Sequence, residues 1–254
     1  MLKIIQQNGL YFSLFLLSFF GVFIWQMRND DLAAFFFFSD HRSVFGDLFF
    51  KNWTMLGEAA PYIAFTGFFL IISEKQWAWR FLMAGFVVAI PTFLFKELLA
   101  VPRPAVVLEQ LGLLSQLKLV ADVSLLTGDN SFPSGHTASA FCVWTLLAFR
   151  FMDNRIAQFF IFIIALLVAI SRVYLIQHYP QDTLFGSCIG VASAIFIEYM
   201  FRKKEAKDRQ NIPKPTALHT VEPYSDIEKY IINNTHTTTV KPEVETVKMD
   251  SETV

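Results

Sequence analysis

Six charged or titratable side chains stand out in an otherwise apolar chain because they fall into three short polar segments. They are Lys96, Arg103, His136, Arg172, His178 and Asp182. Each lies at or beside the end of an apolar run, where a charge is costly unless an oppositely charged group binds there. Because most of the six are cationic or can become so, the segments mark a candidate site for an anion.

The last segment combines a histidine and a carboxylate at helical spacing. His178 and Asp182 are four residues apart, with Pro180 between them, where a helix is expected to begin. A carboxylate that is hydrogen-bonded to one imidazole nitrogen fixes the tautomer and makes the other nitrogen a better nucleophile or base. Arg172 lies six residues upstream of His178, and its guanidinium fork can hold two oxygens of a phosphate.

The middle segment has the features of an anion-binding helix start. It reads Pro133-Ser134-Gly135-His136, and free backbone amides together with the helix dipole favour an anion at such a position. Gly135 lets the backbone come close to a ligand, and Ser134 adds a hydroxyl donor. His136, held protonated by the anion, could donate a proton to a leaving oxygen.

The first segment adds two further cations, Lys96 as a point charge and Arg103 as a fork. Three cations, an anion-binding helix start and two histidines in separate roles suit phosphoryl transfer, where catalysis is mostly positioning and charge stabilisation. A lone histidine at a helix end is more often structural, and basic residues near a membrane boundary often only anchor the chain. The functional interpretation therefore depends on all three segments meeting on one face.

The composition of the chain is that of a membrane protein. Of its 254 residues 54% are hydrophobic, 29 are Phe and only 17% are charged, whereas soluble domains carry about 25% charged residues. The net charge of −1 gives no basic field that would favour nucleic acid as a partner.

Six apolar runs each approach the roughly 20 residues that a helix needs to cross a bilayer. They cover residues 9–27, 55–73, 77–99, 133–151, 156–176 and 183–201. Such long continuous runs suit helices better than barrel strands, because no backbone polar group can go unpaired in lipid. The sequence therefore predicts an all-α integral-membrane bundle of six transmembrane helices, in one domain at residues 1–203.

Basic residues outside the runs predict the orientation of this bundle. One face holds ten of them: Lys3, Lys75, Arg80, Arg150, Arg155, Arg202, Lys203, Lys204, Lys207 and Arg209. The other face holds seven: Arg28, Arg42, Lys51, Lys96, Arg103, Lys118 and Arg172. Three of those seven belong to the polar segments, so we expect both termini to be cytoplasmic and the candidate site to lie on the outer face.

Two linkers and a tail complete the chain. Residues 28–54 mix aspartates with Phe35-Phe36-Phe37-Phe38, which suits a helix lying in the membrane interface after the first span, or else a simple loop with an apolar patch. Residues 105–131 form a long loop that could cover the site. Residues 204–254 are polar and predicted to be a disordered cytoplasmic tail, in which His219 and His236 are isolated and solvated.

The three segments resemble the signature motifs of a known family. Lys96 with Arg103-Pro104, then Pro133-Ser134-Gly135-His136, then Ser171-Arg172 with His178 and Asp182 are similar, in order and spacing, to the three motifs of the type 2 phosphatidic acid phosphatase superfamily. That superfamily includes membrane lipid phosphatases and vanadium haloperoxidases. The resemblance spans about residues 53–201 and shows no departure from the motifs.

The resemblance implies a role for each motif residue. His178 would be the nucleophile that forms a phosphohistidine, Asp182 would orient it, and His136 would protonate the leaving group. The phosphoryl oxygens would be bound by Lys96, Arg103, Ser134, Gly135 and Arg172. It also implies no metal or other cofactor, and the sequence has no carboxylate cluster suited to magnesium.

The function expected from the resemblance is hydrolysis of a phosphomonoester or diphosphate of a membrane lipid, in a bacterial cytoplasmic membrane. Phosphatidic acid, phosphatidylglycerophosphate, undecaprenyl diphosphate and a lipid-linked sugar phosphate stay open as substrates, and so does the oligomeric state. One alternative is a vanadate-dependent haloperoxidase, against which six spans argue. Another is a transporter or non-catalytic phospholipid-binding protein, which would bind the lipid without releasing phosphate.

Overall fold

The computed structural model describes residues 2–210, while residue 1 and residues 211–254 lie outside the description. The described part is helical and contains no strand, which confirms the predicted all-helical class for these residues. Its elements are α1 Leu2–Gln7, α2 Gly9–Gln26, α3 Ala33–Asp40, α4 Val44–Trp53, η1 Thr54–Gly57, α5 Ala59–Ile71, α6 Lys75–Leu99, α7 Pro104–Gln110, η2 Leu114–Gln116, α8 Gly135–Arg150, α9 Arg155–Tyr174 and α10 Pro180–Gln210.

Every predicted apolar run contains a helix, but not every helix is long enough to count as a span by itself. Among the described residues, length and composition qualify four stretches: Gly9–Gln26, Lys75–Gln110, Arg155–Tyr174 and Pro180–Gln210. A fifth arises if Val44–Gly57 and Ala59–Ile71, which meet at 57°, are one bent span. Because α8 has only 16 residues, four or five candidate spans stand against the six that were predicted.

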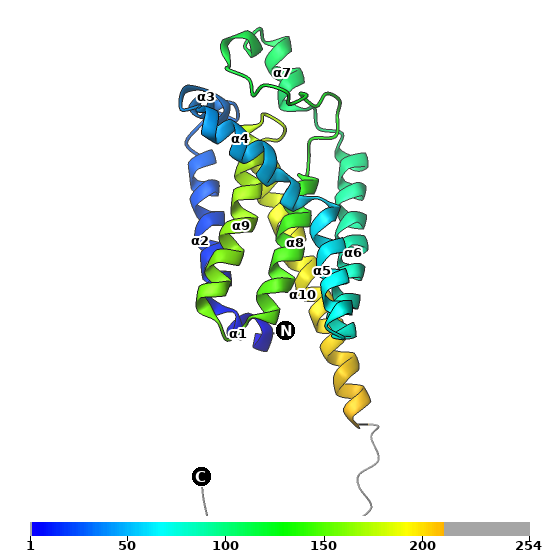
Figure 1. Cartoon of the computed structure of the whole chain (residues 1–254). Helices are drawn as coiled ribbons and strands as arrows, with labels where there is room; N and C mark the ends of the chain where they lie inside the picture. Colours follow the sequence, from blue (N-terminus) through cyan, green and yellow to red (C-terminus); the bar gives the residue numbers. More distant parts are fainter. Residues whose placement is uncertain (1, 211–254) are drawn as a thin grey trace, which may run out of the picture. The chain divides into compact units, whose positions relative to one another are not determined.

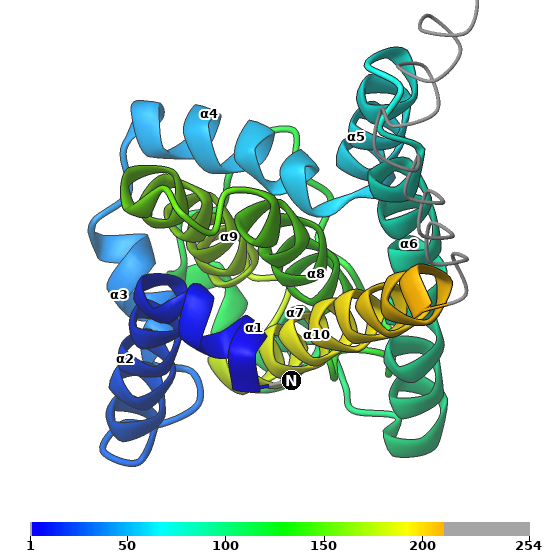
Figure 2. The same ribbon diagram turned by 90° about the horizontal axis from the view of Figure 1, so that it is seen from below.

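The long helices run side by side in the compact unit that ends at Lys207. Figures 1 and 2 show α8, α9 and α10 packed together, with α2 on one side of them and the α5–α6 pair on the other. Most of α8 is buried, from Thr137 to Phe149, so it is the central helix of this arrangement.

Two glycines on α10 allow it to pack closely against α8. Gly186 and Gly190 are four residues apart and therefore lie on one face of α10. A Cβ atom would come within 2.6 Å of the Ser134 carbonyl oxygen at Gly186 and within 2.3 Å of the Ala138 carbonyl oxygen at Gly190. Small residues at this spacing let the backbones of two membrane helices approach each other. The contact brings the start of α8 next to the start of α10.

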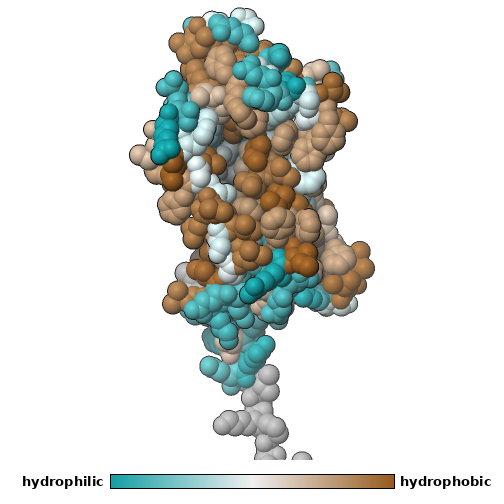
Figure 3. All heavy atoms as spheres, turned by 90° about the vertical axis from the view of Figure 1, so that its left-hand side faces the viewer, coloured by the Kyte–Doolittle hydropathy of each residue, from teal (hydrophilic) through white to brown (hydrophobic). Residues whose placement is uncertain are grey.

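The outward surface of the unit is apolar along the middle of the helices. Figure 3 shows hydrophobic side chains over the middle of one face and hydrophilic ones towards both ends. On α2, for example, Leu16, Leu17, Phe20 and Phe23 are all exposed. Exposed apolar surface on this scale is expected where lipid rather than water is the solvent.

The linker at 28–54 forms two helices where the sequence suggested one. The chain turns at residues 41–43, and Ser43 then caps α4 by accepting a hydrogen bond from the amide of Gly46 over 3.1 Å. The helix that follows exposes Val44, Phe45 and Leu48. A location in the membrane interface remains a prediction for it.

The other linker and the tail also contain helical turns. Residues 105–131 include most of α7 and all of η2, followed by an irregular stretch that returns to the start of α8. Residues 204–210 of the predicted tail continue α10. The rest of the tail, with His219 and His236, lies outside the described residues.

Candidate active site

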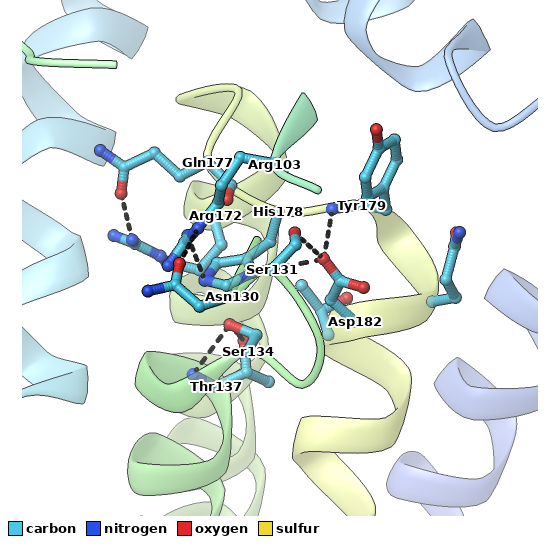
Figure 4. A network of polar contacts seen from close by, with 12 residues as sticks. Arg103, Asn130, Ser131, Ser134, Thr137, Arg172, Gln177, His178, Tyr179 and Asp182 are labelled. Atoms are coloured by element: carbon cyan, nitrogen blue, oxygen red, sulfur yellow. Dashed lines mark hydrogen bonds and ion pairs between the residues drawn. The ribbon is translucent and has the colours of Figure 1, made fainter. Parts of the chain in front are cut away.

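The three polar segments meet at one end of the helices. Figure 4 shows side chains from the loop after α6, the start of α8, the end of α9 and the start of α10 converging on one another. The helix α6 ends at Leu99 and α9 ends at Tyr174, while α8 begins at Gly135 and α10 at Pro180. These four helix ends lie at the same end of the bundle (Figure 1). Segments that are far apart in the sequence thus form one site.

His178 is held at both ring nitrogens and is only 2% exposed. Its Nδ1 lies 3.3 Å from Oδ2 of Asp182, and its Nε2 lies 3.1 Å from Nη1 of Arg103. Because a guanidinium can only donate, Nε2 is the acceptor and Nδ1 carries the proton that faces the carboxylate. The lone pair on Nε2 therefore points towards the cations.

The carboxylate of Asp182 is fixed by three donors. Oδ2 accepts hydrogen bonds from Oγ of Ser131 over 2.6 Å and from the amide of Tyr179 over 3.0 Å, in addition to the contact with His178. The backbone carbonyl of Asp182 accepts from the amide of Ser134 over 3.0 Å. One residue thereby joins the histidine, the long loop and the start of α8.

Arg103 and Lys96 are linked through Asn130. Nε of Arg103 donates to Oδ1 of Asn130 over 2.8 Å, and Nζ of Lys96 donates to the carbonyl oxygen of the same residue. Arg103 also donates from Nη1 to the carbonyl of Gln177 over 2.8 Å. The side chain of Arg103 is 7% exposed, so its charge lies inside the site.

Arg172 is the most deeply buried of the three cations, with 2% of its surface exposed. Nη1 donates to the hydroxyl of Thr54 over 2.7 Å, and Nη2 donates to the side-chain oxygen of Gln177. Its Nε has no hydrogen-bond partner in the described part of the chain. The backbone carbonyl accepts from the amide of His178 over 3.2 Å, which ties the end of α9 to the histidine.

None of these three cations forms an ion pair with a carboxylate within residues 2–210. A buried guanidinium without a counter-ion is costly, so the arrangement favours an anionic ligand. Burial lowers the pKa of His178 well below its ordinary value, and the positive charges of Arg172, Arg103 and Lys96 lower it further. His178 is consequently a neutral imidazole, whose lone pair on Nε2 accepts from Arg103.

The start of α8 supplies the remaining candidate residues. Ser134 is the N-cap of α8, and its Oγ accepts hydrogen bonds from the amide of Thr137 over 3.4 Å and from its hydroxyl over 2.9 Å. Among residues 2–210 the Ser134 hydroxyl donates to no acceptor, so its proton can be donated to a ligand. At Gly135 the nearest atom to an added Cβ is Cγ2 of Thr92 at 3.7 Å, so the backbone is open on that side.

His136 has a partner that the sequence did not suggest. Its Nε2 lies 3.3 Å from Oε1 of Glu58, at the start of α5, and no hydrogen bond within residues 2–210 joins it to the other candidates. The side chain of His136 is 31% exposed, in contrast to the buried His178. The two histidines therefore differ in both exposure and partners.

Several side chains that support the candidates were not found from the sequence. They are Thr54, Glu58, Asn130, Ser131 and Gln177. Asn130 and Ser131 lie at the end of the 105–131 loop, which was expected to cover the site. That expectation was the sequence feature that could have pointed to these two residues. Thr54 and Glu58 lie outside all three polar segments, and only the packing of η1 against α8 and α9 brings them to the site.

Two relatives support a family assignment over part of the chain. Bacitracin transport permease protein BcrC of Bacillus licheniformis is 38% identical over 69 residues, which cover 27% of this chain and 32% of that protein. Phosphatidylglycerophosphatase B of Bacillus subtilis is 36% identical over 88 residues, which cover 32% of this chain and 43% of that protein. The matched segments thus span less than half of each relative.

Two solved structures share the fold over a longer range. The crystal structure of Aquifex aeolicus LpxE superposes with a TM-score of 0.56 at 25% identity and covers 66% of this chain and 94% of that one. The first transmembrane PAP2 type phosphatidylglycerolphosphate phosphatase from Bacillus subtilis gives 0.55 at 21% identity, over 78% of this chain and 96% of that one. The model of the PAP2 superfamily matches residues 77–206, which include all three polar segments and slightly more than half of the chain. The chain therefore belongs to the PAP2 superfamily, as its three motifs predicted.

Proposed function

We propose that the protein is an integral-membrane lipid phosphatase that hydrolyses a phosphomonoester or diphosphate of a lipid through a phosphohistidine. One observation carries the proposal: a buried, neutral His178 is oriented by Asp182 and faces cations that have no counter-ion among the described residues. A nucleophile beside unpaired cations suits a reaction in which a phosphoryl group is both bound and attacked.

In the proposed first step, Nε2 of His178 attacks phosphorus while Arg103, Arg172 and Lys96 neutralise the phosphoryl oxygens. The amides at the start of α8 and the Ser134 hydroxyl add donors, and Gly135 keeps the backbone accessible. The bond from phosphorus to the leaving oxygen breaks, and His136 donates its proton to that oxygen.

In the second step, water attacks the phosphorus of the phosphohistidine. His136, now neutral, accepts a proton from that water, the bond from phosphorus to Nε2 breaks, and inorganic phosphate leaves. His178 returns to its neutral form with Nδ1–H still directed at Asp182. Atoms and charge therefore balance over the two steps without any further reactant.

For the membrane arrangement, we propose that all six apolar runs cross the bilayer, with the site at the outer face and the N-terminal end in the cytoplasm. The short α8 spans about 24 Å at 1.5 Å per residue, and it can cross because neighbouring helices surround it. In the same proposal α4 lies in the interface, with Val44, Phe45 and Leu48 facing lipid.

The proposal is tested by phosphate release from purified protein in detergent, using phosphatidic acid, phosphatidylglycerophosphate, undecaprenyl diphosphate and a lipid-linked sugar phosphate. We expect release from at least one lipid, and loss of that release in His178→Ala and in His136→Ala. Near-full activity of either variant would contradict the role given to that histidine.

The name of one relative, a transport permease protein, favours a second candidate, a lipid-binding or transport protein without turnover. The same buried cations would then hold a lipid phosphate that is never cleaved. Binding of a lipid phosphate by the wild-type protein without phosphate release would support this candidate. Peroxide-dependent halide oxidation after addition of vanadate would instead support the haloperoxidase.

A further inference from the structure

Glu58 lies beside His136, although it belongs to none of the three polar segments. It is the N-cap residue of α5, but its side chain makes no capping hydrogen bond to that helix. Serine, threonine, aspartate and asparagine are the usual residues at an N-cap, because their short side chains reach the free amides. The carboxylate of Glu58 contacts His136 instead, with 3.3 Å between Oε1 and Nε2.

The backbone around Glu58 is anchored on both sides. Before it, the carbonyl of Leu56 accepts a hydrogen bond from Nε1 of Trp144 over 3.2 Å. At Gly57 an added Cβ would come within 2.6 Å of the His136 carbonyl oxygen, so this segment lies directly against the first turn of α8. After it, the hydroxyl of Tyr62 donates to the carbonyl of Ser139 over 2.9 Å. Glu58 is therefore fixed relative to His136 through the backbone.

Glu58 also brings a negative charge next to His136, since its Oε1 lies 3.3 Å from Nε2. A carboxylate at this distance favours the protonated imidazole that the proposed proton transfer requires. The contact through Nε2 has a second consequence, because a hydrogen bond at one ring nitrogen decides which nitrogen exchanges a proton. With Nε2–H directed at the carboxylate, Nδ1 is the ring nitrogen that remains to exchange a proton.

We propose that Glu58 is a positioning residue for His136, whose carboxylate accepts from Nε2–H so that Nδ1 passes the proton to the leaving oxygen. The inference rests on the proposed function, in which His136 protonates the leaving group. On proton transfer the Nδ1–H bond breaks and the O–H bond of the alcohol forms. His136 is then neutral, and its Nε2–H is still held by Glu58.

The test compares two probes that differ in their need for that proton. The leaving group of dioleoyl phosphatidic acid is the alkoxide of dioleoylglycerol, which is poorly stabilised unless it is protonated, whereas p-nitrophenyl phosphate releases a stable phenolate. For Glu58→Gln we expect kcat on phosphatidic acid to fall about tenfold or more, part of the gain that a general acid supplies. The KM should change by less than about threefold, and the first-turnover release of p-nitrophenolate, which precedes the step in which His136 accepts a proton from water, should stay within about twofold.

Three further variants separate positioning from folding. Glu58→Asp should recover part of the lost kcat, because it restores the charge. Glu109→Gln makes the same chemical change on an exposed residue of α7 and should act like the wild type. Adding Glu58→Gln to His136→Ala should cause no further loss, because the two residues act as one unit.

The results of these experiments distinguish failure of the role proposed for Glu58 from failure of the proposed function. An equal loss in the first-turnover rates on both probes, or an additive loss in the double variant, would overturn the role of Glu58 while the proposed function stands. If His136→Ala hydrolyses phosphatidic acid normally, or if the wild-type protein releases no phosphate, the proposed function fails and the role of Glu58 fails with it.

Discussion

Ser131 and Asp182 are joined by a hydrogen bond in which Oγ of Ser131 donates to Oδ2 of Asp182 over 2.6 Å. The same oxygen faces Nδ1 of His178. The end of the long loop before α8 therefore takes part in orienting the candidate nucleophile, although 51 residues separate Ser131 from Asp182. The loop belongs to the site itself and does more than cover it.

This relationship predicts a graded response at the two positions. Ser131→Ala removes one of three donors to Asp182, so we expect kcat to fall about tenfold, the equivalent of one hydrogen bond. Asp182→Asn should cost about 10³-fold or more, because the amide no longer fixes the tautomer of His178. Phosphate release from the preferred lipid under saturating conditions measures both effects. An Asp182→Asn variant as active as Ser131→Ala would contradict the assigned orientation.

The hydrogen bond between Arg172 and Thr54 predicts an effect of Thr54 on substrate binding. The hydroxyl of Thr54 accepts from Nη1 and helps to hold the guanidinium in the fork geometry. Thr54→Val keeps the shape but removes this acceptor, so KM should rise about tenfold with a smaller change in kcat. Thr54→Ser retains the hydroxyl and serves as the matched control. A normal KM in Thr54→Val would mean that Gln177 alone positions Arg172.

The parts of the fold and of the candidate site that could be predicted are those for which single residues carry a strong local signal. Lys96 to Leu99 end one apolar run, and Ser134 and Pro180 mark helix starts, so the segments could be placed at run ends from the sequence. The spacing of His178 and Asp182 similarly requires no tertiary information, because four residues are about one helical turn.

The supporting residues carried no comparable signal. Thr54, Gln177 and Glu58 each contribute one or two hydrogen bonds, and their residue types have many other uses in proteins. Only the tertiary packing of η1 against α8 and α9 brings Thr54 and Glu58 to the site. Gln177 lies in the third polar segment, and only the folded structure shows that it contacts Arg172. The break between α3 and α4 was easier to predict from the sequence, because Ser43 followed by Asp47 in the first turn is a helix-start pattern. The phenylalanine run next to it masked that pattern.

The pH dependence should reflect the neutral state of His178. Attack requires the unprotonated imidazole, so activity is lost as the pH falls through the pKa of the folded protein. Burial and the neighbouring cations lower that pKa, and the acid limb of kcat/KM should therefore lie below pH about 6.5, the ordinary histidine value.

Arg103→Gln provides the comparison that isolates this effect. It removes the positive charge next to Nε2, so the acid limb of kcat/KM should move to higher pH than in the wild type. Using one lipid for both proteins cancels the ionisation of the substrate itself. A limb that stays in place would show that Arg103 does not act on His178 electrostatically.

Metal removal gives a further prediction. Because Lys96, Arg103 and Arg172 supply the positive charge for the phosphoryl oxygens, we expect phosphate release to continue in millimolar EDTA. The measurement compares initial rates of the purified protein before and after chelation. A rate that falls in EDTA and returns with added Mg²⁺ would show that the cations are insufficient by themselves.

The close packing of α10 on α8 predicts that Gly190→Ala disrupts the site from a distance. The added Cβ would lie 2.3 Å from the Ala138 carbonyl oxygen and 2.8 Å from the Cys142 amide nitrogen, both backbone atoms that cannot turn aside. The two helices must separate, at a cost of about 1–3 kcal/mol in the free energy of unfolding.

Their separation also shifts the start of α8, with Ser134 and His136, away from Asp182 and His178. We therefore expect Gly190→Ala to lower both the melting temperature in detergent and phosphate release. Gly21→Ala on α2, where an added Cβ meets no atom within 4 Å, is the matched control and should retain wild-type activity. If Gly190→Ala melted and turned over like Gly21→Ala, contact between the two backbones would not be what sets the distance between the start of α8 and the His178–Asp182 pair.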